Sequence, residues 1–243
     1  MLPEQFGIGP FTISIFGIFV AFSFVVASFL LWRSLREDFL DEEIITFTIF
    51  IVIFSLLGGR IFYIVDNFSY FGVNLARWVL FTRFPGFALT GAYLGVVSFT
   101  TYWSKKKNWD FWVLLDSLTF ALLVAFLIGD FGLFLSHTLA LPLKFFLALA
   151  VLVFALFIKG HFRKFIWYKS GKPGFVAASS TAVFFLGNLV LDFWVKGGLY
   201  LEMVAALAIV FLALGALYQR SEREIKEDIA ALGNFLGGKF VKK

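Results

Sequence analysis

The chain has 243 residues, of which 60% are apolar and 15% are charged, and its formal net charge is +5. This apolar fraction is far above the roughly 45–50% of soluble domains, which excludes an ordinary water-soluble protein and disfavours nucleic-acid binding. The lack of cysteine excludes disulfides, thiolate metal sites and a cysteine nucleophile. His137 and His161 are too few for a histidine-built metal site, so neither a metal nor a cofactor is expected.

Seven long apolar segments predict seven membrane-spanning helices. A helix needs about 20 predominantly apolar residues to cross the hydrocarbon core, and in lipid its backbone groups must be satisfied within the segment. The predicted fold class is therefore all-α, a polytopic membrane helix bundle. The predicted spans are residues 11–31, 44–65, 85–103, 111–135, 142–158, 174–195 and 199–218.

Two polar stretches complete the predicted organisation. Residues 66–84 form a long connection rich in aromatic residues, which is typical of a segment lying in the membrane interface. After Tyr218 the chain turns polar, and Ser221 with Glu224 has the spacing of a helix capping box. We therefore expect a membrane domain over residues 1–218 and a cytoplasmic amphipathic helix with a basic tail over residues 219–243.

The positions of the cationic residues predict the orientation of the bundle. Short loops rich in lysine and arginine stay in the cytoplasm, since cationic side chains resist translocation and favour the anionic inner leaflet. The chain is thus expected to have its N-terminus outside and its C-terminus in the cytoplasm. No cation precedes the first apolar run, so residues 1–10 are not expected to be a cleaved signal peptide. Most of the 21 lysines and arginines lie in four stretches that alternate with pairs of spans: Arg33 to Arg36, Lys105 to Lys107, Lys159 to Lys172, and Arg220 to Lys243.

Several polar side chains fall inside the predicted spans. Each ionisable group there costs roughly 2.5–3.5 kcal/mol on insertion scales, so it needs a partner or a function. Two interpretations remain open from the residues. Arg60 could pair with Asp130 or Asp192 to fix the packing of the helices, or these groups could form a lipid-facing site in the outer half of the bilayer. The residues concerned are Arg60, Asp116, Asp130 and Asp192, with Thr90 and Asn188 beside them.

Short motifs along the whole chain, in their order and spacing, resemble the prolipoprotein diacylglyceryl transferase family. The likeness covers nearly all of the predicted spans. The motifs are Ile8-Gly9-Pro10, Gly59-Arg60 with Tyr63, Gly86 to Gly95, Asp116 followed by Gly129-Asp130-Phe131-Gly132, Lys172-Pro173-Gly174, and Gly187-Asn188 with Asp192-Phe193.

The resemblance implies a multi-pass protein of the bacterial cytoplasmic (inner) membrane. Enzymes of that family transfer a diacylglyceryl group from phosphatidylglycerol to the thiol of a lipobox cysteine in a prolipoprotein. The implied partners are therefore a phosphatidylglycerol-like phospholipid and the signal peptide of a prolipoprotein. The implied substrate-binding positions are Arg60, Tyr63, Asp116, Asp130, Asn188 and Asp192.

Several positions depart from the family pattern where its chemistry is concentrated. Thr90 stands at the position of the family's histidine, and Asp130 and Asn188 stand at the positions of two arginines. The catalytic residues of this chain are therefore unknown. Two alternatives to a transferase follow: an inactive paralogue that binds a lipid or a lipoprotein precursor at the outer leaflet, or a small transporter.

Overall fold

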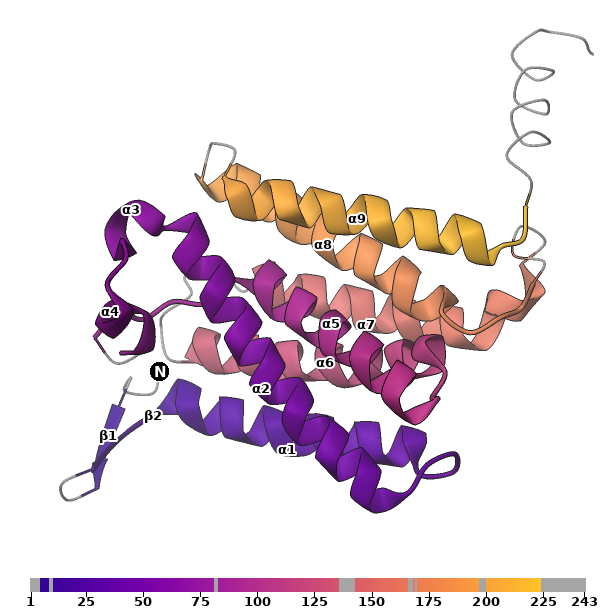
Figure 1. The fold of residues 1–243 in the computed structure, drawn as a ribbon, viewed down its shortest axis with the longest axis horizontal. Coiled ribbons are helices and arrows are strands. Elements are labelled where there is room, and N and C mark those ends of the chain that lie inside the picture. The colour runs from indigo at the N-terminus through magenta and orange to yellow at the C-terminus, as the bar shows by residue number, and fades with distance from the viewer. Residues whose placement is uncertain are drawn as a thin grey trace, which may run out of the picture.

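The computed structural model describes residues 5–8, 11–80, 83–135, 143–165, 168, 170–196 and 200–223. Long helices dominate these residues and run between the same two ends of the molecule at different tilts, with α2 steeply inclined to α9 (Figure 1). The elements in chain order are strands β1 (Gln5–Ile8) and β2 (Phe11–Ser14), helices α1 (Ile15–Leu35), α2 (Asp41–Asp66), α3 (Phe68–Phe71), α4 (Leu75–Val79), α5 (Leu89–Lys107), α6 (Phe111–Leu135) and α7 (Leu143–His161), the 3₁₀ turn η1 (Phe162–Lys164), and helices α8 (Phe175–Lys196) and α9 (Leu201–Arg220).

The bundle has two chemically different ends, which we call the hairpin end and the basic end. At the hairpin end lie the β1–β2 hairpin, α3 and α4, on the left of Figure 1. At the basic end, on the right, lie the turn between α1 and α2, the connection between α7 and α8, and the end of α9. The described parts of the four cationic stretches fall at this basic end, as a common orientation of those loops requires.

Six helices are long and apolar enough to cross a membrane, counted among the described residues: α1, α2, α6, α7 with η1, α8 and α9. Their outward surfaces remain apolar, with Val25 62%, Phe211 66% and Leu212 71% exposed. A continuous apolar exterior of this kind fits lipid rather than water. The protein is therefore a multi-pass membrane protein.

The first predicted span begins too early. Residues 11–14 form strand β2, which pairs antiparallel with β1 in the register Gln5↔Ser14 to Ile8↔Phe11. Ser14 ends the strand and caps α1, because its Oγ accepts a hydrogen bond from the Gly17 N–H at 3.0 Å. Thr12 and Ile13 are β-branched residue types that favour the strand. The span predicted at residues 11–31 is consequently α1, at Ile15–Leu35.

The other predicted spans match helices with small shifts at their ends. The prediction of 111–135 coincides with α6, whereas α2 begins three residues before 44. The connection at 66–84 contains the two short helices α3 and α4. The expected amphipathic helix falls mostly in 224–243, outside the described residues, and the two-part division stays a prediction.

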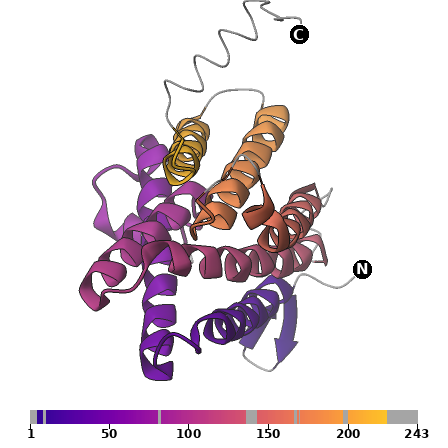
Figure 2. The ribbon, with the colours of Figure 1, turned by 90° about the vertical axis from the view of Figure 1, so that its right-hand side faces the viewer.

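Helices α6 and α8 form the centre of the bundle. α6 packs against α1, α7 and α8, and α8 also packs along α9. Seen from the basic end, α1 lies at the bottom and α8 and α9 at the top, with α6 and α7 between them (Figure 2). One apolar core lies between α6, α7, α8 and α9. A second lies between α1, α2, α5 and α6 and includes the rings of Phe47, Phe99 and Trp103.

Glycines bring the backbones of α2 and α5 together. A Cβ at Gly95 would overlap the Phe54 carbonyl, and a Cβ at Gly58 would overlap the Gly91 carbonyl. This is the close packing that small residues four apart permit in membrane helices. A change of side-chain rotamer cannot relieve these overlaps, because the atoms in the way belong to the backbone. An added Cβ would therefore push the two helices apart.

We expect Gly95→Ala to destabilise the protein by about 1–3 kcal/mol, because overpacking forces α2 and α5 apart. Thermal unfolding of the purified protein in detergent measures the effect. Gly215→Ala on α9 is the matched control, since nothing lies within 4 Å of its added Cβ. If both variants keep the wild-type melting temperature, the close contact between α2 and α5 at Gly95 is contradicted.

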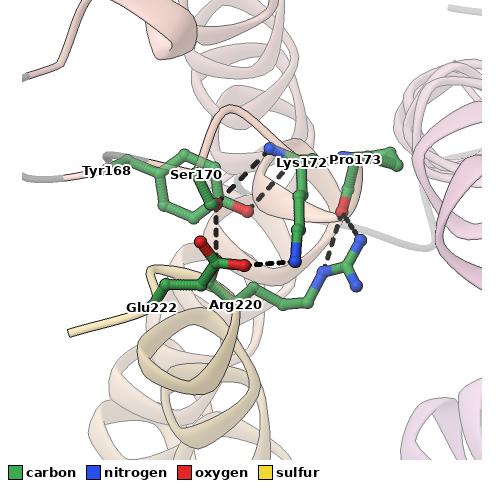
Figure 3. Close-up of polar contacts among 6 residues, drawn as sticks. All are labelled: Tyr168, Ser170, Lys172, Pro173, Arg220 and Glu222. Atoms are coloured by element: carbon green, nitrogen blue, oxygen red, sulfur yellow. Dashed lines mark hydrogen bonds and ion pairs between the residues drawn. The ribbon is translucent and has the colours of Figure 1, made fainter. Parts of the chain in front are cut away.

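A set of polar contacts at the basic end joins the α7–α8 connection to the end of α9 (Figure 3). Ser170 Oγ donates to the Arg220 carbonyl at 2.6 Å, and Arg220 Nη2 donates to the Pro173 carbonyl at 2.7 Å. Lys172 forms an ion pair with Glu222. These contacts fix the segment that leads into α8.

Candidate functional site

A small polar cluster at the hairpin end lies where α5, α8 and α9 meet. Thr90, Asn188, Asp192 and Glu202 line a cavity of about 10 Å³ there. We call these four residues the hairpin-end cluster. Thr90 is 2% and Asn188 6% exposed, so the cluster is buried at its centre. The predicted meeting of Thr90, Asn188 and Asp192 near one end of the bundle is therefore present in the structure.

Hydrogen bonds within the protein occupy much of this cluster. Glu202 Oε1 accepts from the Leu89 N–H at 3.1 Å, which caps the start of α5. Asn188 Nδ2 donates to the Phe184 carbonyl of its own helix at 2.9 Å. The Thr90 hydroxyl finds no hydrogen-bond partner among the described residues.

Lys144 supplies a cation beside the cluster. Its Nζ lies 3.0 Å from Asp192 Oδ1, and it also acts electrostatically on Asp130 near the end of α6. Asp192 is 19% and Lys144 42% exposed, so water or lipid headgroups screen this pair in part. Among the described side chains, Lys144 thus lies beside the carboxylates of Asp192 and Asp130, and the Glu202 carboxylate lines the same cavity as Asp192.

Arg60 has a different role from the one expected. It is 4% exposed and donates four hydrogen bonds to backbone carbonyls in the segment between α3 and α5. Its guanidinium also lies 5.1 Å from the ring of Phe71. None of the ion pairs found among the described residues joins Arg60 to Asp130 or Asp192, so the first of the two interpretations, a pair with either carboxylate, is wrong. The acceptors are the carbonyls of Trp78 (3.0 Å), Phe84 (2.7 Å), Gly86 (3.1 Å) and Arg77 (2.9 Å).

Tyr63 supports the same segment as Arg60. Gly86 has φ +146°, which L side chains rarely adopt, and the Tyr63 ring occupies the space of its missing side chain. The Tyr63 ring also meets Phe71 edge to face at 5.9 Å. Arg60 and Tyr63 therefore hold the connection into α5, and through it they position Thr90.

Asp116 lies at the opposite end of the bundle from the hairpin-end cluster. Its carboxylate accepts hydrogen bonds from the N–H groups of Gly174 and Ala177, both at 2.7 Å. These are the donors at the start of α8 that lack helical partners, so Asp116 acts as a cap supplied by another helix. The six predicted binding positions therefore do not form one site.

The sequence-based list of site residues omitted Glu202 and Lys144. Each carries a signal that could have identified it. Glu202 is a carboxylate in the first turn of an otherwise apolar helix. Lys144 lies in the first turn of α7, where the helix dipole disfavours a cation and a nearby carboxylate is therefore needed. In the described part of the chain, no group of three or more histidine, aspartate or glutamate side chains could hold a metal ion.

Comparison with known proteins gives one consistent result. A family model for prolipoprotein diacylglyceryl transferases matches residues 3–236. The chain is similar to proteins named phosphatidylglycerol–prolipoprotein diacylglyceryl transferase, and it spans about half the length of the curated relatives it matches. Examples come from Ligilactobacillus salivarius (27% identity; 59% of this chain and 54% of the relative), Listeria innocua (28%; 56% and 49%) and Clostridium novyi (29%; 56% and 53%).

Proposed function

Since the chain belongs to the prolipoprotein diacylglyceryl transferase family, we propose that it binds a membrane lipid or a lipoprotein precursor at its hairpin end without transferring a diacylglyceryl group. The observation that carries the proposal is the closed, carboxylate-rich hairpin-end cluster. The relatives' names make phosphatidylglycerol and a prolipoprotein the reference substrates for any test.

Charge argues against transfer. Moving a diacylglyceryl group from phosphatidylglycerol to a thiol requires cations that stabilise the phosphate leaving group, and a base that activates the thiol. Lys144 is a cation beside the cluster, and it already pairs with Asp192. A phosphodiester would face the further carboxylates of Asp130 and Glu202, and their repulsion is strong in a low dielectric.

Space and hydrogen bonding point the same way. A cavity of about 10 Å³ is close to the minimum of roughly 10–15 Å³ that holds one water molecule. A lipid headgroup is therefore excluded from the centre of the cluster, and the proposed binding is at its edge, beside the partly exposed Lys144. Arg60, which the resemblance suggests as a phosphate ligand, is engaged with four backbone carbonyls. Using it as a ligand would break these part-buried hydrogen bonds.

The test is one incubation with two readouts. Purified protein is mixed with labelled phosphatidylglycerol and a lipobox peptide, and both retained lipid and labelled peptide are quantified. We expect retained lipid with no labelled peptide above the protein-free background. Robust labelling of the peptide that disappears in Asp192→Ala would instead establish a rebuilt active site.

Such a rebuilt transferase is the second candidate, and the Lys144–Asp192 pair beside Asn188 and Glu202 favours it. The pair offers a cation for a phosphate oxygen and a carboxylate that could accept the thiol proton. In this case Glu202→Gln and Asp192→Asn should differ, because Glu202 caps α5 whereas Asp192 would carry the chemistry. The transfer assay with these two variants separates the candidates.

We also propose seven spans, with α5 as the seventh. Its 19 residues measure about 28 Å at about 1.5 Å per residue, close to the roughly 30 Å hydrocarbon core. It packs along α2 over this length. At one end the Ala88 N–H donates to the Gly59 carbonyl, and at the other end Lys107 forms an ion pair with Glu43. Threonine, serine and glycine lower its hydropathy without shortening it.

The cationic stretches support an orientation with the basic end in the cytoplasm of a bacterial inner membrane. Cysteines introduced at Asp38 and Ser104 are expected to react with a membrane-impermeant maleimide only after the cells are opened. A cysteine at Ser69, which is exposed in α3, is expected to react in intact cells. The reverse pattern at both ends would refute the orientation.

A further inference from the structure

A cavity at the basic end lies apart from the hairpin-end cluster. Its volume is about 250 Å³, slightly below the roughly 300–1,000 Å³ of drug-sized ligand sites, so it suits a small headgroup. Apolar side chains complete its wall. We call it the basic-end cavity, and its polar lining consists of Ser34 of α1, Asp116 and Ser117 of α6, Lys159 of α7 and Arg163 of η1.

Of the described residues, two cations and one carboxylate line the basic-end cavity. The Lys159 ammonium lies 4.8 Å from the ring of Phe120, so it is directed towards α6. Arg163 contributes a guanidinium, whose planar donors suit phosphate oxygens. The carboxylate is Asp116, and both of its oxygens accept backbone N–H groups at the start of α8. Its charge is thereby partly compensated, and the cations outnumber it.

A hydroxyl donor adds to the cations. Ser34 Oγ donates to Ser117 Oγ at 2.9 Å. A hydroxyl carries one hydrogen and two acceptor lone pairs, so this bond uses only the acceptor side of Ser117. The Ser117 hydrogen remains able to point into the cavity. The lining thus offers an ammonium, a guanidinium and a hydroxyl to one small ligand.

We propose that the basic-end cavity binds a phosphate group, carried by the headgroup of an anionic phospholipid or as free phosphate. Anionic headgroups are abundant at the cytoplasmic surface, where the cationic loops are placed by the proposed orientation. The inference uses the proposed orientation, but it does not depend on the proposed binding at the hairpin end, which concerns the opposite end of the bundle.

The experiment measures equilibrium binding to the full-length protein in detergent by calorimetry. The probes are dioctanoyl-phosphatidylglycerol, dioctanoylglycerol without a phosphate, and inorganic phosphate. The test variant is Lys159→Gln/Arg163→Gln. Its matched control is Lys105→Gln/Lys106→Gln, which removes two exposed cations at the same end that do not line the cavity. The variant Asp192→Asn measures how much of the binding takes place at the hairpin end.

We expect the cavity variant to bind phosphatidylglycerol at least about tenfold more weakly than wild type, with the control within about twofold. Dioctanoylglycerol should show no such difference. The same loss with inorganic phosphate would identify free phosphate as a sufficient ligand, and a loss confined to the lipid would identify the headgroup. Unchanged affinity in the cavity variant, or an equal loss in the control, would overturn the proposal. A loss in Asp192→Asn with the cavity variant unchanged would assign lipid binding to the hairpin end alone and would also overturn the proposal.

Discussion

Arg60→Ala is expected to destabilise the protein severely and to lower the yield of folded material in the membrane. The wild-type guanidinium donates to the carbonyls of Arg77, Trp78, Phe84 and Gly86. All four hydrogen bonds are part-buried, and a hydrogen bond to a charged group contributes about 1.5–3 kcal/mol, so the loss of the four together amounts to several kcal/mol. Thermal unfolding of purified protein, together with the monodisperse yield after detergent extraction, measures this effect.

Two controls separate the hydrogen bonds from the charge. Arg83→Ala removes an exposed cation from the same connection and should leave the melting temperature unchanged. Arg60→Lys keeps the charge, but an ammonium cannot reproduce the planar fork that reaches several carbonyls, so most of the loss should remain. A melting temperature in Arg60→Ala equal to that of Arg83→Ala would contradict the clamp described here.

The helical spans could be predicted from sequence because their cause is local. Each depends on the length and apolar content of one segment, and in lipid an apolar run of about 20 residues satisfies its backbone groups by forming a helix. The start of α1 could not be placed in this way. It depends on the pairing of β2 with β1 and on the Ser14 cap, and apolar residues continue through both elements.

The partners of the buried charges were harder to predict. The sequence shows that Arg60 needs hydrogen-bond acceptors. A sequence distinguishes residues only by their side chains, so the acceptors that it suggests are the carboxylates of aspartate. The acceptors in the structure are backbone carbonyls, which every residue offers and which only the three-dimensional path of the connection brings to Arg60. Asp116 is a similar case, since its partners are backbone N–H groups of α8.

The last prediction concerns the family positions at which this chain departs. Thr90→His/Asp130→Arg/Asn188→Arg together should produce measurable transfer of diacylglyceryl to a lipobox peptide, at least about tenfold above wild type. A single preorganised donor is worth about 10²–10³ in rate, and residues acting as a unit are strongly non-additive. Each single variant should therefore stay at the wild-type level, and the triple variant should remain well below an active relative.

The physical basis of this expectation is charge at the hairpin end. Thr90 and Asn188 line the same cavity, and Asp130 interacts with Lys144 beside it, so the triple variant adds cations to this region and removes one carboxylate. The buried Thr90 leaves little room for a histidine, so folding must be verified by gel filtration, with Asp130→Arg alone as the variant that keeps the packing. The matched control is Thr90→Ser/Asp130→Asn/Asn188→Gln, which changes the same positions without adding cations. Equal transfer by this control, or no transfer by a folded triple variant, would show that the missing cations do not explain the inactivity we propose.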